Sequence, residues 1–186
     1  SCNYTVNKKT AIELNKIFLE VIIANGFKKD ALKILKKKKN LRLIDATNLD
    51  QTNTDSLISN FNSILIQSLD NIKFASKNFK IVSKKKPSSK QLNDLIFAFN
   101  LCRYTKSNAI VIAKNQSTVG IGSGQPSRLD SCKIAIDKMN KFQTLNLTDA
   151  VAASDAFFPF VDGIEKLIQS GVSAIIQPLG SIRDKE

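Results

Sequence analysis

The stretch NAIVIAKNQSTVGIGSGQPSRLDS, Asn108 to Ser131, places an apolar run, a polar turn and a glycine-rich run in close succession. The apolar run 109–113 predicts a buried strand, and the polar turn 114–117 predicts a hairpin that returns along a second strand, 118–122. The glycine-rich run leads into a helix expected to reach about Asn140. Strand, strand and helix in this order indicate a layered α/β fold.

The flanking sequence continues the α/β pattern. Residues 20–24 and 41–45 are short apolar runs, and the amphipathic segment 29–38 between them predicts a helix. Such a β-α-β order favours a parallel pair of strands joined by a crossover helix. The remaining predicted elements are helices over 10–18, 89–104 and 162–170 and strands over 64–68, 79–82, 150–154 and 172–177.

The three glycines Gly120, Gly122 and Gly124 allow two interpretations. They could cradle a phosphate at the start of the following helix, or they could let two backbones pass closely. Neither the P-loop pattern nor the dinucleotide fingerprint is present. Arg128 favours a functional site, because a cation in the first helical turn opposes the helix dipole.

Composition narrows the classes of function. The 186 residues suffice for one domain or two small ones, and the formal net charge is +12. The charge keeps one alternative open, a lysine-rich nucleic-acid-binding module without catalysis, although only four basic residues are arginines. The absence of histidine excludes a Ser-His-Asp triad or a Cys-His pair within this chain. Three widely spaced cysteines indicate a reducing compartment, and no apolar run reaches the ~18 residues of a membrane helix.

Two further stretches carry candidate binding residues. Ser154 to Phe160 places three aromatic residues around a proline, either as a hydrophobic plug under the sheet or as a flat platform for a ring. Asp162 follows it and could accept hydrogen bonds from an amino-heterocycle. Gly180 to Asp184 is either a turn before a helix or a polar loop at the carboxyl end of a strand, where α/β proteins bind ligands.

Four motifs together resemble the AICAR transformylase region of the bifunctional purine biosynthesis family. They stand in the family's order and are strongest between Pro87 and Glu186, while the resemblance from Ser1 to Lys86 is thinner. The motifs are KSNAIV (106–111), GIGSGQPSR (120–128), SDAFFPF (154–160) and QPLGSIRD (177–184).

The resemblance implies a duplicated, cytidine-deaminase-like layered α/β fold that works as a homodimer in the cytoplasm. Residues 1–86 would be the end of a first transformylase subdomain, and 87–186 a second subdomain without its C-terminal end. The implied reaction transfers a formyl group from 10-formyltetrahydrofolate to AICAR in purine biosynthesis, and an N-terminal domain of the full-length protein would be an IMP cyclohydrolase. The family uses no zinc, and neither a nucleic acid nor a membrane is an expected partner.

Site residues follow from the resemblance position by position. The AICAR nucleotide would be held by Glu20, Asn108, Arg128 and Phe157, with Asn108 near the reacting amine and formyl groups. The folate side would be formed by Leu129, Pro159, Asp162, Ser181 and Ile182. A potassium ion is implied near Ser107 and Asp155. The glycines would then let the hairpin approach the ligand.

The chain also departs from the family's pattern. The catalytic Lys-His dyad is not in this sequence and is expected upstream of Ser1, so the chain alone is predicted to be inactive. Val161 stands where relatives usually carry arginine. A binding fold that has kept its ligand site without catalysis is a further alternative.

Overall fold

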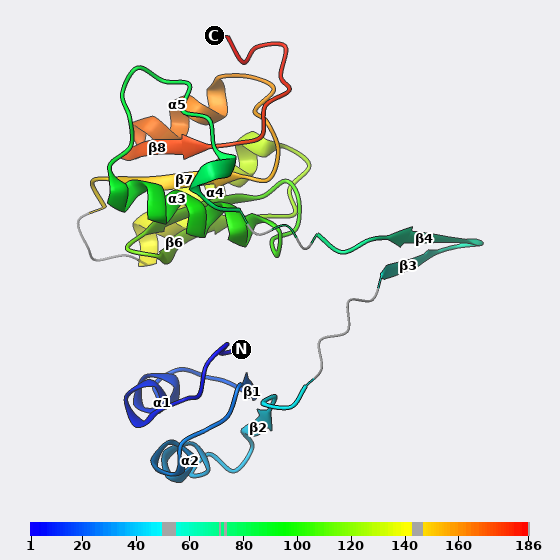
Figure 1. The fold of residues 1–186 in the computed structure, drawn as a ribbon, viewed down its shortest axis with the longest axis vertical. Helices are drawn as coiled ribbons and strands as arrows, with labels where there is room; N and C mark the ends of the chain where they lie inside the picture. Colours follow the sequence, from blue (N-terminus) through cyan, green and yellow to red (C-terminus); the bar gives the residue numbers. More distant parts are fainter. Residues whose placement is uncertain (50–54, 71, 73, 143–146, 186) are drawn as a thin grey trace. The chain divides into compact units, whose positions relative to one another are not determined.

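The computed structural model describes residues 1–49, 55–70, 72, 74–142 and 147–185, and it divides the chain into two compact units, Ser1–Leu69 and Asp70–Glu186 (Figure 1). Lys86, the predicted end of a first transformylase subdomain, therefore lies inside the second compact unit. The assignment of family subdomains stays a prediction. No helix within the described ranges is long and apolar enough to cross a bilayer.

The first unit contains the predicted β-α-β arrangement. Strands β1 (Val21–Ala24) and β2 (Arg42–Asp45) pair in parallel, and helix α2 (Lys29–Leu35) connects them. Helix α1 (Lys8–Asn15) precedes them, and the Asn7 side chain accepts a hydrogen bond from the Thr10 amide at 3.0 Å. Both helices end sooner than predicted. The buried core of this unit is formed by Val6, Ala11, Ile22, Ala24, Ala31 and Leu35.

A two-stranded hairpin closes the first unit. Strands β3 (Ser56–Asn60) and β4 (Ser63–Gln67) pair antiparallel (Figure 1). Every residue of both strands is exposed. The prediction of a strand over 64–68 is confirmed within one residue. Strand β3 was not predicted, because its serines and asparagine obscure the apolar signal of its two central residues.

The second unit is built on a four-stranded sheet in the order β6-β5-β7-β8. Strand β5 runs antiparallel to both neighbours, and β7 and β8 are parallel. The predicted hairpin and the predicted strands 150–154 and 172–177 are thereby confirmed. The elements of this unit are α3 (Ser89–Cys102), β5 (Ile110–Lys114), β6 (Ser117–Gly122), α4 (Arg128–Phe142), β7 (Ala150–Ser154), α5 (Asp162–Gln169) and β8 (Val172–Ile176).

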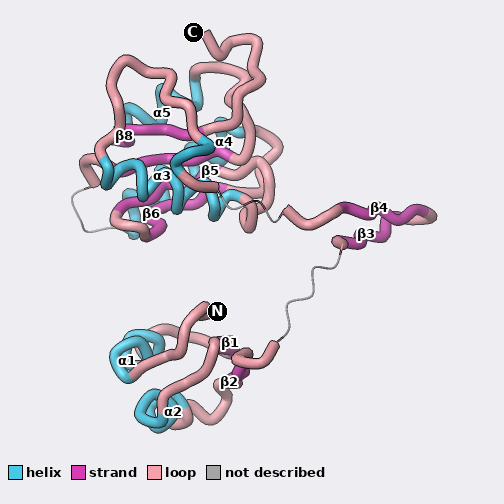
Figure 2. Tube along the Cα trace, in the orientation of Figure 1, coloured by secondary structure: helices cyan, strands magenta, loops and turns pink. Residues whose placement is uncertain are grey.

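Helices cover both faces of this sheet, as Figure 2 also shows. On one face, Val111 and Val151 belong to the core that contains residues of α3. On the other face, Ile110 and Ile112 belong to the core that contains residues of α4 and α5. Successive side chains of a strand point to opposite faces, so a strand buried on both faces must be apolar throughout. This explains why β5 and β7 read as continuous apolar runs.

Two of the three central glycines serve close packing between β6 and α4. A Cβ atom on Gly122 would lie 1.8 Å from the Ser131 carbonyl oxygen, and one on Gly120 would lie 2.1 Å from the Ala135 carbonyl oxygen. Both distances are far below van der Waals contact. The interpretation that two backbones pass closely is therefore confirmed here, and the expectation that these glycines admit a ligand is wrong for Gly120 and Gly122.

The segment 79–82 is not a strand, which corrects the prediction. It carries no regular secondary structure and follows a short 3₁₀ turn, Ser76–Asn78. The Phe79 ring instead joins a cluster with Phe74 and Phe99, with ring centroids 4.6–6.3 Å apart. Packing of one aromatic side chain on α3, rather than pairing of the backbone, holds this segment.

Candidate functional site

The register of the sheet gathers the predicted residues of the second unit at one edge. Ile110, at the start of β5, lies opposite Gly122 at the end of β6 and opposite Ser154 at the end of β7. The parallel strand β8 ends at the same edge, because Ala153 pairs with Ile176. The loops that follow β6, β7 and β8 and the segment before β5 therefore meet here.

Arg128 is the centre of a hydrogen-bonded cluster at this edge. It is the first residue of α4, and 9% of its side chain is exposed. Its Nη1 atom donates to Ser154 Oγ at 2.8 Å and to an Asp155 oxygen at 2.5 Å, and its Nη2 atom donates to Asn108 Oδ1 at 2.8 Å. These bonds use three of the five guanidinium donors. The predicted residues Asn108, Arg128 and Asp155 are thus brought together.

Asn108 links this cluster to the glycine-rich loop. Its Nδ2 atom donates to the carbonyl oxygens of Gln125 at 2.9 Å and Pro126 at 3.1 Å. Its own carbonyl oxygen accepts a hydrogen bond from Ser131 Oγ at 2.7 Å. Because both amide donors are engaged, the side-chain oxygen is fixed toward Arg128 and keeps a second lone pair for another donor.

Asp155 is held in its ionised form. Burial alone would raise its pKa, but hydrogen bonds from the Ser107 side chain, the Arg128 guanidinium and the Ala109 amide outweigh burial and lower the pKa of Asp155 below its ordinary value. The Ala109 amide donates to Asp155 at 2.9 Å. The cluster therefore contains a compensated ion pair, and Arg128 opposes the dipole of α4 while paired with a carboxylate.

Both interpretations of the aromatic segment after β7, a hydrophobic plug and a flat platform, apply to different residues of it. Phe158 is buried in the core beneath α5, where its ring would lie 2.8 Å from a Cβ atom on Gly163. Phe157 and Phe160 are exposed, and the Arg183 guanidinium lies over the Phe160 ring at 5.1 Å. The plug interpretation holds for Phe158, whereas Phe157 and Phe160 expose ring surface and Arg183 covers part of the Phe160 ring.

The loop after β8 packs beside this segment. Gln177 Oε1 accepts a hydrogen bond from the Phe158 amide at 2.9 Å, and a Cβ atom on Gly180 would lie 3.3 Å from the Phe157 ring. The Gly180 amide in turn donates to Asp184 at 2.8 Å. The two loops that carry most of the predicted folate residues are therefore neighbours.

The predicted folate residues lie on two helices, α4 and α5, and on the loops that follow β7 and β8. Leu129 is in the first turn of α4 and Asp162 is the first residue of α5, where its carboxylate accepts the Gly163 amide at 2.7 Å. Ser181 Oγ accepts the Arg183 amide at 3.1 Å, whereas Ile182 is fully exposed. Pro159 and Val161 are exposed in the loop between β7 and α5. The binding roles of these residues stay predictions.

The hydrogen bonds of the cluster do not establish two predicted features, the role of Glu20 and the potassium ion. Glu20 belongs to the first unit, where its carbonyl oxygen accepts the Arg42 amide at 2.9 Å, so its place beside Arg128 stays a prediction. Asp155 contacts hydrogen-bond donors, including a guanidinium, which does not favour a potassium ion at that carboxylate. Among the residues that the structure describes, no three His, Cys, Asp or Glu side chains are placed to hold a metal ion.

Sequence reasoning did not single out three side chains that shape the site. Ser154 is fully buried, receives the Arg128 hydrogen bond and donates to the Ala156 carbonyl oxygen at 2.6 Å. Gln177 and Asp184 order the loop after β8. A polar residue directly at the end of an apolar strand was the available signal for Ser154 and Gln177.

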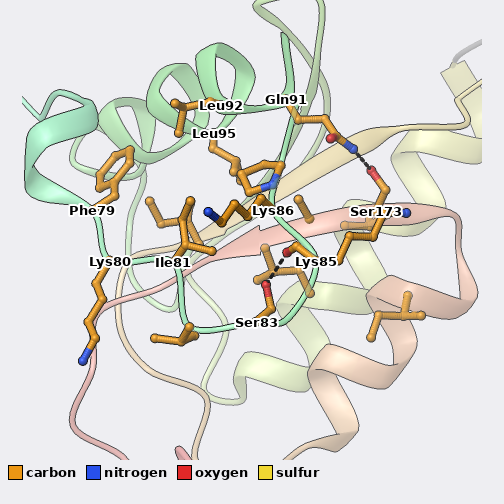
Figure 3. Close-up of a pocket in the computed structure, with 17 residues that line it drawn as sticks. Phe79, Lys80, Ile81, Ser83, Lys85, Lys86, Gln91, Leu92, Leu95 and Ser173 are labelled. Carbon is orange, nitrogen blue, oxygen red and sulfur yellow. Dashed lines mark hydrogen bonds between the residues drawn. The ribbon is translucent and has the colours of Figure 1, made fainter. Parts of the chain in front are cut away.

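A separate pocket of about 380 Å³ lies on the second unit, between the segment 79–87 and strand β8 (Figure 3). It is largely apolar, and Lys86 extends across it. At one end, Gln91 Nε2 donates to Ser173 Oγ at 2.7 Å. None of the predicted binding residues lines this pocket, so it is distinct from the Arg128 cluster.

Comparison with known proteins connects this geometry to a family. The family model described as AICARFT/IMPCHase bienzyme matches residues 1–138. Curated relatives named bifunctional purine biosynthesis protein PurH include those of Ligilactobacillus salivarius, 47% identical over 99% of this chain and 36% of the relative, and Caldicellulosiruptor saccharolyticus, 44% identical over 99% and 35%. A relative in Fusobacterium nucleatum is 47% identical over 99% of the chain and 36% of its own length.

The match covers almost the whole chain but only part of each relative. The chain spans about a third of the length of the curated relatives it matches. Residues 1–138 include Asn108 and Arg128 of the cluster, so the family match includes part of the candidate site. The chain belongs to the AICARFT/IMPCHase bienzyme family.

Proposed function

We propose that this chain forms part of the substrate-binding wall of an AICAR formyltransferase. The reaction would transfer a formyl group from 10-formyltetrahydrofolate to the 5-amino group of AICAR in purine biosynthesis, in a protein that also carries IMP cyclohydrolase activity. The name of these relatives, bifunctional purine biosynthesis protein PurH, supports this assignment. The observation that carries it is the Asn108–Arg128–Asp155 cluster, because it joins two predicted nucleotide contacts within one hydrogen-bonded unit.

Asn108 and Arg128 would have distinct roles in binding AICAR. Arg128 keeps two guanidinium donors beyond the three used inside the cluster, and these suit an oxygen-rich ligand such as a nucleotide. Asn108 Oδ1, which is fixed by Arg128, is suited to accept a hydrogen bond from the amino group of AICAR. This contact would orient the nitrogen lone pair toward the formyl donor.

Proton transfer needs other groups. Formylation of an amine releases a proton from the nitrogen, and a general base must accept it. Asp155 is poorly suited to this role, because its lowered pKa and its ion pair with Arg128 make it a weak base. We therefore assign Asp155 a positioning role through Arg128 and expect the Lys-His dyad of the family to supply the base.

The folate would lie beside the loops that follow β7 and β8. Phe157 and Phe160 expose ring surface there, and Asp162 exposes a carboxylate at the start of α5. A carboxylate suits the amino-pyrimidinone edge of a pterin, which offers paired N–H donors. Homodimer formation and a cytoplasmic location belong to the same proposal. The nucleic-acid alternative finds no support in the family match.

Calorimetry with AICAR and with a 10-formylfolate analogue tests this assignment. Asp162→Ala should weaken binding of the folate analogue by about tenfold or more, because a hydrogen bond to a charged group is worth about 1.5–3 kcal/mol. The same variant should leave AICAR affinity unchanged. Asp130→Ala is the matched control, since Asp130 is an acidic residue on α4 that pairs with Lys133 at 3.0 Å.

Three results would reject the proposal. Loss of AICAR affinity in Asp162→Ala, with folate affinity kept, would reverse the assigned sides of the site. Equal losses of folate-analogue affinity in Asp162→Ala and Asp130→Ala would show that the effect comes from net charge and not from a contact with Asp162. Absence of saturable binding of either ligand would remove the substrate-binding role of this chain.

A further inference from the structure

Ser154 places a buried hydroxyl group in an otherwise apolar row of side chains. It is the last residue of β7 and is fully buried. Side chains two positions apart on a strand share a face, so Ser154 continues the row of Ala150 and Ala152, which belong to the core that contains residues of α4 and α5. Alanine at this third position would leave no polar group to satisfy on that face. Packing alone therefore does not account for the hydroxyl.

Three polar or charged residues are buried in the part of the chain that the structure describes, namely Asp94, Ser131 and Ser154. Asp94 accepts two backbone amides from the turn between β5 and β6. Ser131 donates to the backbone carbonyl oxygen of Asn108. Ser154 is the member of this group that contacts a cationic side chain, because it accepts a hydrogen bond from Arg128.

Both hydrogen-bonding functions of the Ser154 hydroxyl are in use. It donates to the Ala156 carbonyl oxygen at 2.6 Å, and it accepts from Arg128 Nη1 at 2.8 Å. A serine hydroxyl has a single donor, so the bond to Ala156 determines where its hydrogen lies and leaves the lone pairs for the guanidinium. A hydroxyl that donates one hydrogen bond is also a better acceptor of another.

The two partners of this hydroxyl lead to two predicted AICAR contacts on different elements. Arg128 is the first residue of α4, whereas the Ala156 carbonyl belongs to the peptide bond that enters Phe157, in the loop after β7. The resemblance assigns both Arg128 and Phe157 to the nucleotide. One buried hydroxyl therefore directs the guanidinium of the first contact and the backbone of the second.

The ion pair with Asp155 does not fix the plane of the Arg128 guanidinium by itself. Asp155 accepts one hydrogen of Nη1, and Asn108 accepts one hydrogen of Nη2. Ser154 accepts the second hydrogen of Nη1, so both donors of that nitrogen are engaged. This third bond opposes rotation of the guanidinium about its Nε–Cζ bond. The remaining donors, on Nε and Nη2, are thereby held in fixed directions for a ligand.

We propose that Ser154 is a positioning residue that holds Arg128 and the Phe157 segment in the arrangement that binds the AICAR nucleotide. Ser154 touches no substrate in this role, because it acts through the guanidinium and through the Ala156 carbonyl. The nucleotide part of the inference rests on the proposed function, whereas the hold on Arg128 does not. Such preorganisation raises affinity because the donors need not be ordered when the ligand binds.

Nuclear magnetic resonance of the arginine side chains tests the hold on Arg128 without any ligand. The chain has only four arginines, and Arg128→Lys identifies the Arg128 signals by their loss. In the wild type, the two Nη signals of Arg128 should be resolved, because the hydrogen bonds slow rotation about Nε–Cζ. Ser154→Ala should speed this rotation about threefold or more, since the loss of a hydrogen bond lowers the barrier. Ser154→Thr, which keeps the hydroxyl, should retain the slow rotation.

Calorimetry with AICAR tests the consequence for binding. Ser154→Ala should weaken AICAR binding about threefold to tenfold, and Ser154→Thr should bind within about twofold of the wild type. Phe157→Leu should cost less affinity in the Ser154→Ala background than in the wild type, because the hydroxyl holds both contacts. Ser170→Ala is the matched control and should change neither readout, since Ser170 Oγ donates to the Leu167 carbonyl oxygen at 2.7 Å at the end of α5.

The outcomes separate this inference from the proposed function. Faster Arg128 rotation and weaker AICAR binding in Ser154→Ala, both restored in Ser154→Thr, support the positioning role. A single averaged Nη signal in the wild type overturns it, as does unchanged rotation or unchanged AICAR affinity in Ser154→Ala. Slow rotation in a wild-type chain that shows no saturable AICAR binding rejects the proposed function and the nucleotide part of the inference, while it supports the hold on Arg128.

Discussion

Arg128 and Asp155 should be energetically coupled. Replacement of Arg128 by alanine removes three side-chain hydrogen bonds and leaves a carboxylate that is only 18% exposed without its counter-charge. Removing one partner of a buried ion pair typically costs 3–5 kcal/mol. Asp155 keeps hydrogen bonds from Ser107 and Ala109, so we expect about 3 kcal/mol for Arg128→Ala.

The double variant isolates the interaction. Asp155→Ala should cost a similar amount, because it leaves the guanidinium of Arg128 buried and removes the acceptor for the Ala109 amide. With both charges gone, neither is left unpaired, so the double variant should be about 2–3 kcal/mol more stable than additivity predicts. Urea unfolding followed by far-UV circular dichroism measures each free energy of unfolding.

The exposed pair Asp130–Lys133 provides the control cycle. Both side chains are about half exposed, and their separation is 3.0 Å. Exposed pairs couple by about 1 kcal/mol or less. If Arg128→Ala and Asp155→Ala were additive within about 0.5 kcal/mol, the account of the cluster as one electrostatic unit would be refuted.

Three further outcomes follow from packing and burial. Gly122→Ala should destabilise the fold by about 3 kcal/mol or more, since its Cβ atom would lie 1.8 Å from a carbonyl oxygen of α4, and urea unfolding should show no comparable loss in Ser123→Ala. The lowered pKa of Asp155 stabilises the folded protein at pH values above the ordinary carboxyl pKa of about 4, and this stabilisation is lost as the pH falls through the lower folded-state pKa. The free energy of unfolding should therefore fall less steeply with decreasing pH in Asp155→Asn than in the wild type. Burial raises the pKa of Cys102 and of Cys132 to about 12, so iodoacetamide should label these thiols only after unfolding, and rapid labelling of either in the native protein would contradict their burial.

The sheet of the second unit was predictable because burial on both faces leaves a strong signal. Strands β5 and β7 are apolar except for their last residues, Lys114 and Ser154, and the turn between β5 and β6 is polar. In a segment that is held by side-chain contacts, the sequence pattern predicted the wrong secondary structure. Residues 79–82 have strand-like composition, but the Phe79 ring packs in an aromatic cluster and no ladder forms.

The sequence allowed the residues of the candidate site to be predicted, but not most of the contacts that these residues make. Asn108 and Arg128 stood in recognisable motifs, and the register of the sheet brings them together. Local patterns could not show that Gly122 faces the backbone of α4, because that contact depends on how the helix packs on the sheet. The role of Ser154 was hidden for the same reason, since its partner lies 26 residues away in the sequence.

The central claim is that the Arg128 cluster binds the AICAR nucleotide, and calorimetric titration of AICAR into this chain tests it most directly. The account predicts saturable binding that falls by about tenfold or more in Arg128→Lys, because lysine keeps the charge but lacks the planar fork of donors. Lys133→Ala, an exposed change on the same helix, should bind like the wild type. Absence of saturable binding, or equal affinities in Arg128→Lys and the wild type, would contradict the account.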